Sequence, residues 1–282
     1  MTEPKLAVYA LAALTLAACG GSPNAKDKAA LAALQTRIAA LEHRKTLVAD
    51  TIEIERLQAA FGYYFDKALW DDVANLFAAD GTIEIALDGV YVGKARVREY
   101  LNAYGGQAGA REGRLDEHLQ AMPVVTLAAD GLSAKARWRG IVLEGDYGGD
   151  AHWGEGPYEN EYVKANGVWK IKTLHWYQAL FVPYAGGWQT NPDPTGGKHV
   201  TTLTPDRPPS VDYKTWPDTY LPPFSFPNPV AKYVPPAGES GGAPGAARPQ
   251  VCRAGHWQSA HPSQLRCSAA RSRAPSRKRR RR

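Results

Sequence analysis

One carboxylate in this sequence stands where a helix is expected to end, directly after three aromatic residues. Asp66 follows Tyr63, Tyr64 and Phe65. A carboxylate in that place is either a solvated turn residue or a group placed for acid–base chemistry. An aspartate walled by aromatic rings needs a hydrogen-bond donor, and an imidazole is the natural one. The aspartate then fixes the orientation of the histidine, and the second ring nitrogen stays free as a general base.

Two further acids nearby have a simpler explanation. Asp71 and Asp72 fall in the first turn of a predicted helix at 68–78, ALWDDVANLFA. The helix dipole favours carboxylates in a first turn. We therefore expect these two residues to start a helix, and Asp66 remains the candidate acid or base.

The elements that position Asp66 follow from periodicity and turn signals. Asp50 is predicted to be the N-cap of the helix that carries Asp66, and Gly105 and Gly106 are predicted to end a later helix. A short turn is expected at Asp88-Gly89. The predicted helices are 26–46, 51–67, 68–78 and 95–104, and the short strands 82–87 and 89–93 lie between the last two.

The second half of the chain predicts an antiparallel sheet. Asp130-Gly131 and Asn166-Gly167 separate alternating segments, which is a strong hairpin signal. The glycine-rich loop 145–156 is predicted to be a lid whose His152 and Trp153 could contact a ligand. Helices first and an antiparallel sheet last indicate an α+β fold. The predicted strands are 118–128, 132–145, 156–165 and 168–181.

Strand alternation nominates the walls of a pocket. Lys135, Arg137 and Arg139 alternate and should face solvent, so Trp138 faces inward. The same rule turns these residues inward: Tyr158, Asn160, Tyr162, Trp169, Ile171, Thr173, His175 and Tyr177. An aromatic pocket of this kind suits a cyclic or aromatic substrate. Trp138, Trp169 and Tyr162 could instead be core residues, and His175 is a second candidate acid or base. The predicted substrate-binding residues are Tyr63, Trp138, Tyr158, Asn160, His175 and Tyr177.

The N-terminal residues suggest export. Residues 1–18 have a Lys and then a short apolar run, which is typical of a secretory signal and too short for a membrane span. The sequence around Cys19, LAACGGS, resembles the lipobox of bacterial lipoproteins, and this resemblance implies lipidation at Cys19. An ordinary signal peptide is the alternative. Residues 19–49 then form a linker, in which Leu31, Leu34, Ile38 and Leu41 mark an amphipathic helix that is either a spacer or a short coiled coil.

The C-terminal residues account for the positive charge. The formal net charge is +6, but residues 249–282 hold ten Lys and Arg and no acid, so the rest of the chain is net acidic. We expect this basic tail to be disordered, and we expect no nucleic-acid partner. Cys252 and Cys267 lie in it and could pair in an oxidising compartment. The sequence has no Cys/His metal spacing and no dinucleotide or phosphate-binding motif, so no metal and no cofactor are expected.

A Pro- and Gly-rich extension occupies residues 190–248. Its aromatic residues, Trp216, Tyr220, Phe224 and Phe226, are too many for a free linker. We expect the extension to lie along the domain in extended form or to meet a partner, with a polyproline ligand as a further alternative.

The order of elements in residues 50–189 resembles a known family. The segments LWDDVANLFAADGTIEI and NGVWKIKTLHWY are similar to the SnoaL-like branch of the nuclear transport factor 2-like superfamily. The resemblance implies a cone-shaped fold in which N-terminal helices pack on a strongly curved antiparallel sheet. It also implies a catalytic dyad of Asp66 and His118 at the open end of the cone, as in scytalone dehydratase. The second histidine that scytalone dehydratase uses on the next strand is not found in ARWRGIVLEG.

These observations lead to an expectation about function. We expect a lipid-anchored protein of the bacterial cell envelope that faces the periplasm or the outside. Its domain would be a cofactor-independent lyase, dehydratase or isomerase, in which His118 moves a proton and Asp66 orients it. The substrate would be a small aromatic or cyclic molecule. The alternatives are a module that binds a ligand or partner without catalysis and an envelope scaffold. A homodimer is left open.

Overall fold

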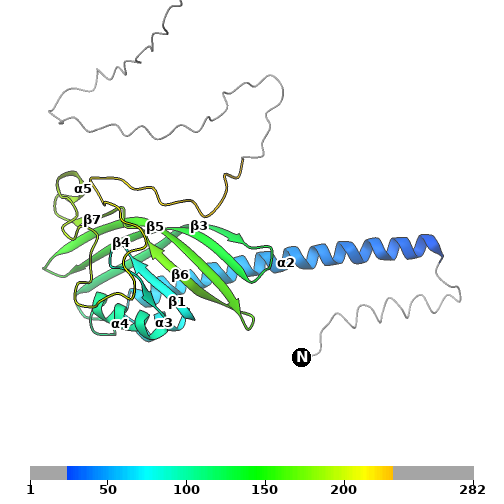
Figure 1. Ribbon diagram of the computed structural model, residues 1–282, viewed down its shortest axis with the longest axis horizontal. Coiled ribbons are helices and arrows are strands. Elements are labelled where there is room, and N and C mark those ends of the chain that lie inside the picture. The colour runs from blue at the N-terminus through cyan, green and yellow to red at the C-terminus, as the bar shows by residue number, and fades with distance from the viewer. Residues whose placement is uncertain (1–23, 231–282) are drawn as a thin grey trace, which may run out of the picture. The chain divides into compact units, whose positions relative to one another are not determined.

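The computed structural model describes residues 24–230 (Figure 1). The predicted signal with Cys19 and the basic tail at 249–282 lie outside the described residues. The elements are α2 (Ala25–Phe65), α3 (Trp70–Asn75), β1 (Phe77–Ile85), β2 (Tyr91–Val92), α4 (Lys94–Gly105), β3 (Arg114–Leu127), β4 (Ser133–Asp146), β5 (Ala151–Ala165), β6 (Val168–Trp176), β7 (Leu180–Pro183) and α5 (Gly187–Thr190).

One curved sheet forms the body of the domain, and its strand order is β2-β1-β6-β5-β4-β3, with β7 paired to β5. β1 and β6 are parallel, and the other pairs are antiparallel. Helices α2, α3 and α4 precede most of the sheet in the chain and lie along it (Figure 1). This arrangement confirms the predicted α+β class.

The helix that ends at Phe65 is longer than predicted. Residues 25–65 form one helix, whose N-cap is Asn24 and not Asp50. The segment TLVAD contains no helix-breaking residue, so the helix continues through it. Asp50 is buried, and its Oδ1 accepts hydrogen bonds from Lys164 Nζ at 2.5 Å and from Trp169 Nε1 at 3.1 Å.

The α3 region follows the prediction at its start and departs from it at its end. Asp71 and Asp72 lie in the first turn, and Asp71 also pairs with Arg98 at 2.5 Å. The predicted helix ends early, because Phe77 already begins β1 and pairs with β6. Trp70 is buried against Gly105, where a Cβ atom would lie 2.4 Å from the indole.

A bulge in β6 changes which side chains face the core. Ile171 and Leu174 are both fully buried, although they are three positions apart. The register of β5 against β6 shifts at this point, and Asn160 Oδ1 accepts the N–H of His175 at 3.2 Å. The extra residue reverses the alternation beyond Ile171. The prediction that Thr173, His175 and Tyr177 point inward is therefore wrong, and they lie on the outer face of the sheet.

The described part of the C-terminal extension lies along that outer face. Ser210 donates from its main-chain N–H and its hydroxyl to Glu84, at 2.7 and 2.6 Å. The guanidinium carbon of Arg137 lies over the ring of Phe224, 4.1 Å from the ring centroid. The side chain of Arg137 is only 13% exposed and pairs with Glu159, so the prediction that Arg137 faces solvent is wrong.

The predicted lid at 145–156 is a β-hairpin. β4 runs to Asp146 and β5 begins at Ala151, so His152 and Trp153 lie within a strand that also pairs with β7. Gly154 permits this close packing, because a Cβ atom there would lie 2.8 Å from Cβ of Val142. Gly145, Gly154 and Gly156 allow close strand packing, so the prediction that 145–156 is a glycine-rich loop is wrong outside the turn at 147–150.

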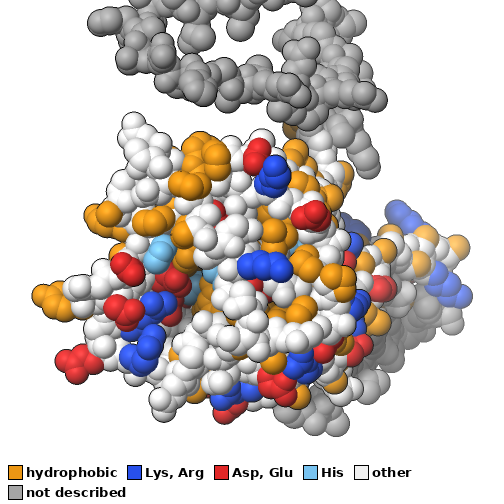
Figure 2. All heavy atoms as spheres, turned by 60° about the vertical axis from the view of Figure 1, so that its left-hand side comes forward, with side chains coloured by type: hydrophobic (Ala, Val, Ile, Leu, Met, Phe, Trp, Pro, Cys, Tyr) orange, Lys and Arg blue, Asp and Glu red, His pale blue; other side chains and the backbone are white. Residues whose placement is uncertain are grey.

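The surface of the described part is mixed in character. On the face in Figure 2, acidic and basic side chains lie beside one another, histidines lie among them, and hydrophobic side chains are scattered between. No helix within residues 24–230 combines the length and apolar character that crossing a membrane requires.

Candidate active site at the sheet edge

The end of α2 lies close to β3, the edge strand of the sheet. Gly62 makes this approach possible, since a Cβ atom there would lie 3.0 Å from the main-chain oxygen of His118. One turn later, Asp66 caps the helix. The ring of Phe65 packs edge-on against His118, with 4.4 Å between centroids. The helix thus delivers a carboxylate and an aromatic wall to one histidine.

The Asp66 carboxylate holds His118 twice. Its Oδ1 accepts the main-chain N–H of His118 at 2.7 Å and lies 3.1 Å from ring Nδ1. Both side chains are buried, with 7% of Asp66 and 4% of His118 exposed. Because an ionised carboxylate can only accept, Nδ1 carries the proton and Nε2 is left with its lone pair. The structure therefore brings together the two residues predicted as the dyad.

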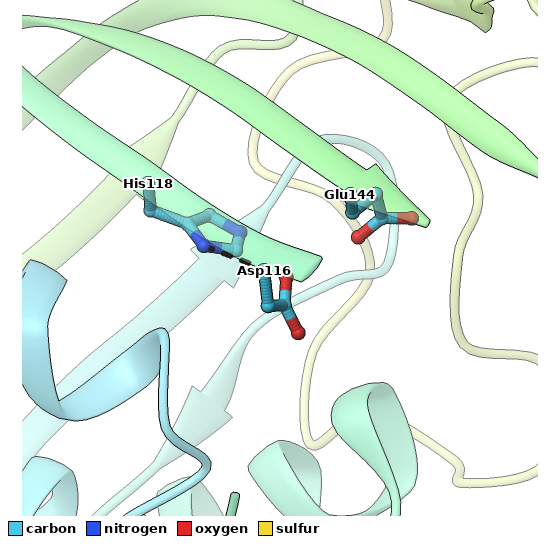
Figure 3. A group of neighbouring side chains, drawn as sticks. All are labelled: Asp116, His118 and Glu144. Carbon is cyan, nitrogen blue, oxygen red and sulfur yellow. Dashed lines mark ion pairs between the residues drawn. The ribbon is translucent and has the colours of Figure 1, made fainter. Parts of the chain in front are cut away.

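His118 belongs to a buried polar cluster with Asp116 and Glu144. Among residues 24–230, neither His118 Nε2 nor Asp116 Oδ1 has a hydrogen-bond partner, and both are buried. Asp116, His118 and Glu144 point toward one another, with a polar atom of each within 4.8 Å of the others (Figure 3). Strand register explains the grouping: Asp116 pairs with Glu144 across β3 and β4, and His118 follows Asp116 by two residues on the same face.

Arg114 balances the charge of the two carboxylates. Its guanidinium lies 3.4 Å from Asp116 and 3.3 Å from Glu144. Burial raises the pKa of Asp116, while His118 and Arg114 act in the opposite direction. The three side chains of the cluster could supply ligands to a cation, but Arg114 already occupies both carboxylates.

Aromatic residues close the cluster on the helix side. Tyr104 of α4 lies 5.6 Å from Phe65 and 5.5 Å from His199, measured between ring centroids. Burial raises the pKa of Tyr104 well above its ordinary value, and the carboxylates of Glu144, Asp88 and Asp116 add to the effect. Its hydroxyl therefore stays protonated and can donate a hydrogen bond.

Three of the predicted pocket residues point inward but are already occupied. Trp138 Nε1 donates to the hydroxyl of Tyr162 at 2.9 Å, and Asn160 Nδ2 donates to Gln58 Oε1 at 2.9 Å. Tyr158 is buried, with its ring 6.2 Å from those of Phe61 and Trp176. These side chains fill the inside of the domain. The polar side-chain nitrogens of Trp138 and Asn160 already have hydrogen-bond partners within the core.

The other three predicted pocket residues do not point into the core. Tyr63 is 74% exposed on the outside of α2. His175 and Tyr177 stack on each other at 3.7 Å on the outer face, beyond the β6 bulge. His175 Nδ1 lies 3.4 Å from Glu84, and burial lowers the pKa of His175 to about 3. The prediction that His175 and Tyr177 share a pocket with the dyad is therefore wrong, whereas Tyr63 lines the same groove as Asp66 and His118.

Two hollows of the domain differ in the residues that line them. A groove of about 360 Å³ between α2 and β3 is lined by Ala59, Gly62, Tyr63, Asp66, Glu117, His118, Leu119, Gln120 and Ala121. A larger hollow of about 530 Å³ contains Asp80, Lys135, Glu161 and Lys172. Its charges are already paired, Lys172 with Asp80 at 2.5 Å and Lys135 with Glu161 at 2.9 Å. We therefore take the smaller groove, which reaches the dyad, as the relevant one.

The sequence prediction missed Asp116, Glu144, Arg114 and Tyr104. A signal for two of them was present. The inward set that contains Trp138 continues along β4 through Val142 to Glu144, which the β3–β4 register places opposite Asp116. Tyr104 gave no signal beyond being the last aromatic of a helix.

Comparison with known proteins places this site in a family context. Residues 46–175 match the family model described as SnoaL-like domain. No curated protein matches the sequence.

Solved structures also resemble this chain, and the three given below have low sequence identity to it. A protein of unknown function from Mycobacterium tuberculosis is 21% identical, with TM-score 0.41, covering 48% of this chain and 74% of that one. A hexachlorocyclohexane dehydrochlorinase is 19% identical, with TM-score 0.44 and coverage of 51% and 94%. A nuclear transport factor 2-like protein with a cystatin-like fold, from Novosphingobium aromaticivorans, is 19% identical, with TM-score 0.40 and coverage of 49% and 87%.

Proposed function

Starting from the SnoaL-like domain in residues 46–175, we propose that the protein is a cofactor-independent lyase, dehydratase or isomerase that acts on a small aromatic or cyclic molecule. One observation carries the proposal. His118 has Nδ1 fixed by Asp66 at 3.1 Å, while its Nε2 is buried without a partner among residues 24–230, and the carboxylates of Asp116 and Glu144 lie close to the ring. A histidine oriented by a carboxylate, with its second nitrogen free, is the arrangement of a general base.

The reaction would begin with proton transfer to His118. Nε2 takes a proton from a carbon next to a carbonyl group of the substrate, and Asp66 stabilises the imidazolium that forms. The electron pair moves onto the carbonyl oxygen, to which the neutral hydroxyl of Tyr104 can donate a hydrogen bond.

Two outcomes then differ in where the proton goes. In an isomerisation, the imidazolium returns the proton to another carbon. In an elimination, the electron pair expels a hydroxyl group, which leaves as water after taking a proton from the imidazolium or from Asp116. Burial raises the pKa of Asp116, which favours the protonated carboxyl that such a step requires.

A turnover screen with matched variants tests the proposal. The probes are cyclic β-hydroxy ketones and cyclic enones, followed by the absorbance of the conjugated product. We expect His118→Gln and Asp66→Asn to lower kcat/KM by about 10²- to 10⁴-fold, the usual contribution of a general base. Glu161→Gln is the control, because the carboxylate of Glu161 pairs with Lys135 at the surface and lies outside the groove that contains the dyad. Unchanged turnover in both dyad variants would refute the mechanism.

Binding without catalysis is the second candidate. The observation in its favour is that Nε2 of His118 and Oδ1 of Asp116 are buried and lack partners in the described part of the chain, so a bound ligand could satisfy both without reacting. Calorimetry with the same probes separates the candidates. Binding that persists without product in the unmodified chain indicates the binding module.

We propose, from the sequence around Cys19, that the domain is exported and anchored in the bacterial cell envelope by lipidation. Acyl chains on Cys19 would hold it at the membrane surface. The test is fractionation of cells that express the Cys19→Ala variant. The variant should appear in the soluble fraction, and a variant that stays in the membrane fraction would contradict lipidation.

A further inference from the structure

The first half of α2 carries an uncovered apolar stripe. Residues 24–46 are all exposed, so this part of the helix is not packed against the rest of the described chain. Large apolar side chains are 41–61% exposed along it: Leu31, Leu34, Ile38, Leu41, Val48 and Ile52. Isolated helices are marginal in water, and most of their stability in proteins comes from packing an apolar face. The stripe therefore calls for a covering partner.

The spacing of the stripe is that of a coiled coil. The apolar positions follow one another at intervals of three and four residues, and Lys45 occupies the single position that interrupts the series. In heptad terms, Leu31 and Ile38 are a positions, Leu34 and Leu41 are d positions, and Lys45 is an a position. Three heptads with this pattern indicate that the partner is another helix with an apolar stripe of the same spacing.

The stripe faces away from the domain. Ile54, which packs into the core, follows Ile52 by two residues. Two residues correspond to about 200° around an α-helix, so the stripe and the buried side of α2 lie on opposite sides. A second helix can therefore lie along the stripe without meeting the domain of the first chain.

We propose that the stripe binds the same stripe of a second copy of this chain, as a parallel two-stranded coiled coil. The flanking charges support this orientation. In a parallel pair, Arg37 at a g position lies opposite Glu42 at the next e position of the other copy, and the contact occurs twice by symmetry. In an antiparallel pair aligned over residues 31–48, Arg37 would face Arg44, which is repulsive. Lys45 in the core fixes the register at a cost in stability.

Light scattering on the full chain tests the proposal. We expect a mass about twice the 30.7 kDa of one chain, falling to the monomer mass on dilution. Replacing Leu34 and Leu41 together by Glu should give a monomer at all concentrations. Replacing Thr36 and His43 by Glu adds the same acids on the outward f positions of the same helix, and this control should remain a dimer.

Disulfide trapping tests the orientation. With Cys19, Cys252 and Cys267 replaced by Ser, Leu41→Cys should oxidise to a covalent dimer, because d positions meet their own copies only in a parallel pair. Thr36→Cys should not. A monomeric unmodified chain, a dimer that survives the Leu34 and Leu41 substitutions, or equal trapping at Thr36 would each overturn the proposal. None of these readouts depends on turnover, so this proposal and the proposed function can fail separately.

Discussion

The hydrogen bonds around Gln58 can be tested by changing one side chain. Gln58 is fully buried in α2. Its Nε2 donates to Gln120 Oε1 at 2.8 Å, and its Oε1 accepts from Asn160 Nδ2 at 2.9 Å and from the hydroxyl of Tyr162 at 2.7 Å. A leucine has a similar size and makes none of these bonds. We expect Gln58→Leu to lower the free energy of unfolding.

The magnitude follows from the groups that lose their partners. Asn160 Nδ2 keeps a contact with the Tyr162 hydroxyl at 3.2 Å, and Gln120 is only partly buried and lines the groove, so the hydroxyl hydrogen of Tyr162 is the buried group left without a partner. Each buried polar group left unsatisfied costs about 1–3 kcal/mol. One such group gives about 1–3 kcal/mol, which is a substantial part of the roughly 5–15 kcal/mol that typically stabilises a domain.

Equilibrium unfolding in urea, followed by circular dichroism, measures the change. All variants are compared at one chain concentration, since self-association would make stability concentration-dependent. Gln107→Leu is the control, because Gln107 is exposed in a loop. Combining Gln58→Leu with Tyr162→Phe should cost less than the sum of the single changes, because both partners are then removed. A loss below about 1 kcal/mol for Gln58→Leu, or full additivity, would refute the reasoning.

Two other perturbations have defined expected results. Gly62→Ala should fail to give the usual gain of about 1 kcal/mol for Gly→Ala in a helix, because the added Cβ would lie 3.0 Å from the main-chain oxygen of His118; urea unfolding that shows the full gain would contradict this contact. Acidification should weaken the protein through His175, whose pKa is lowered by burial to about 3. A lowered folded-state pKa gives stability that is present above about pH 6.5 and is lost as pH falls toward 3, by at most about 1.4 kcal/mol per pH unit. Burial raises the pKa of the neighbouring Glu84, whose contribution has the opposite sign, so the relevant measure is the difference between the unmodified chain and His175→Asn. Equal pH profiles for the two proteins would show that His175 is not buried in its neutral form.

The parts of the fold with local signals could be predicted from the sequence. Gly131, Asn166 and Gly167 all have positive φ angles in the tight turns where the hairpins were expected. The α+β class followed from the order of helices and strands. These features depend on residues close together in the chain, which is why composition and periodicity reveal them.

The errors arose where a distant contact decides the local structure. Asp50 looks like a helix start, but it is held inside the helix by Lys164 and Trp169 of the sheet. His175 was assigned to the wrong face because one extra residue in β6 shifts the alternation, and the side chain that accommodates the shift is Asn160 on another strand. Neither partner can be identified from a single segment.

The candidate site shows the same division. Asp66 stood out from its local sequence, but its pairing with His118, 52 residues away, came from the family resemblance. Asp116 and Glu144 meet because of the β3–β4 register, which alternation along one strand does not fix.

The position of His118 on an edge strand has a consequence for solvent exchange. The outward N–H and C=O groups of an edge strand normally face water. At His118, the N–H instead donates to the Asp66 carboxylate at 2.7 Å, and the oxygen accepts from Gln120 Nε2 at 3.1 Å. This amide should therefore exchange its hydrogen slowly for an edge position, and only while α2 is seated against β3. Its exchange rate reports on the assembly of the site without any substrate.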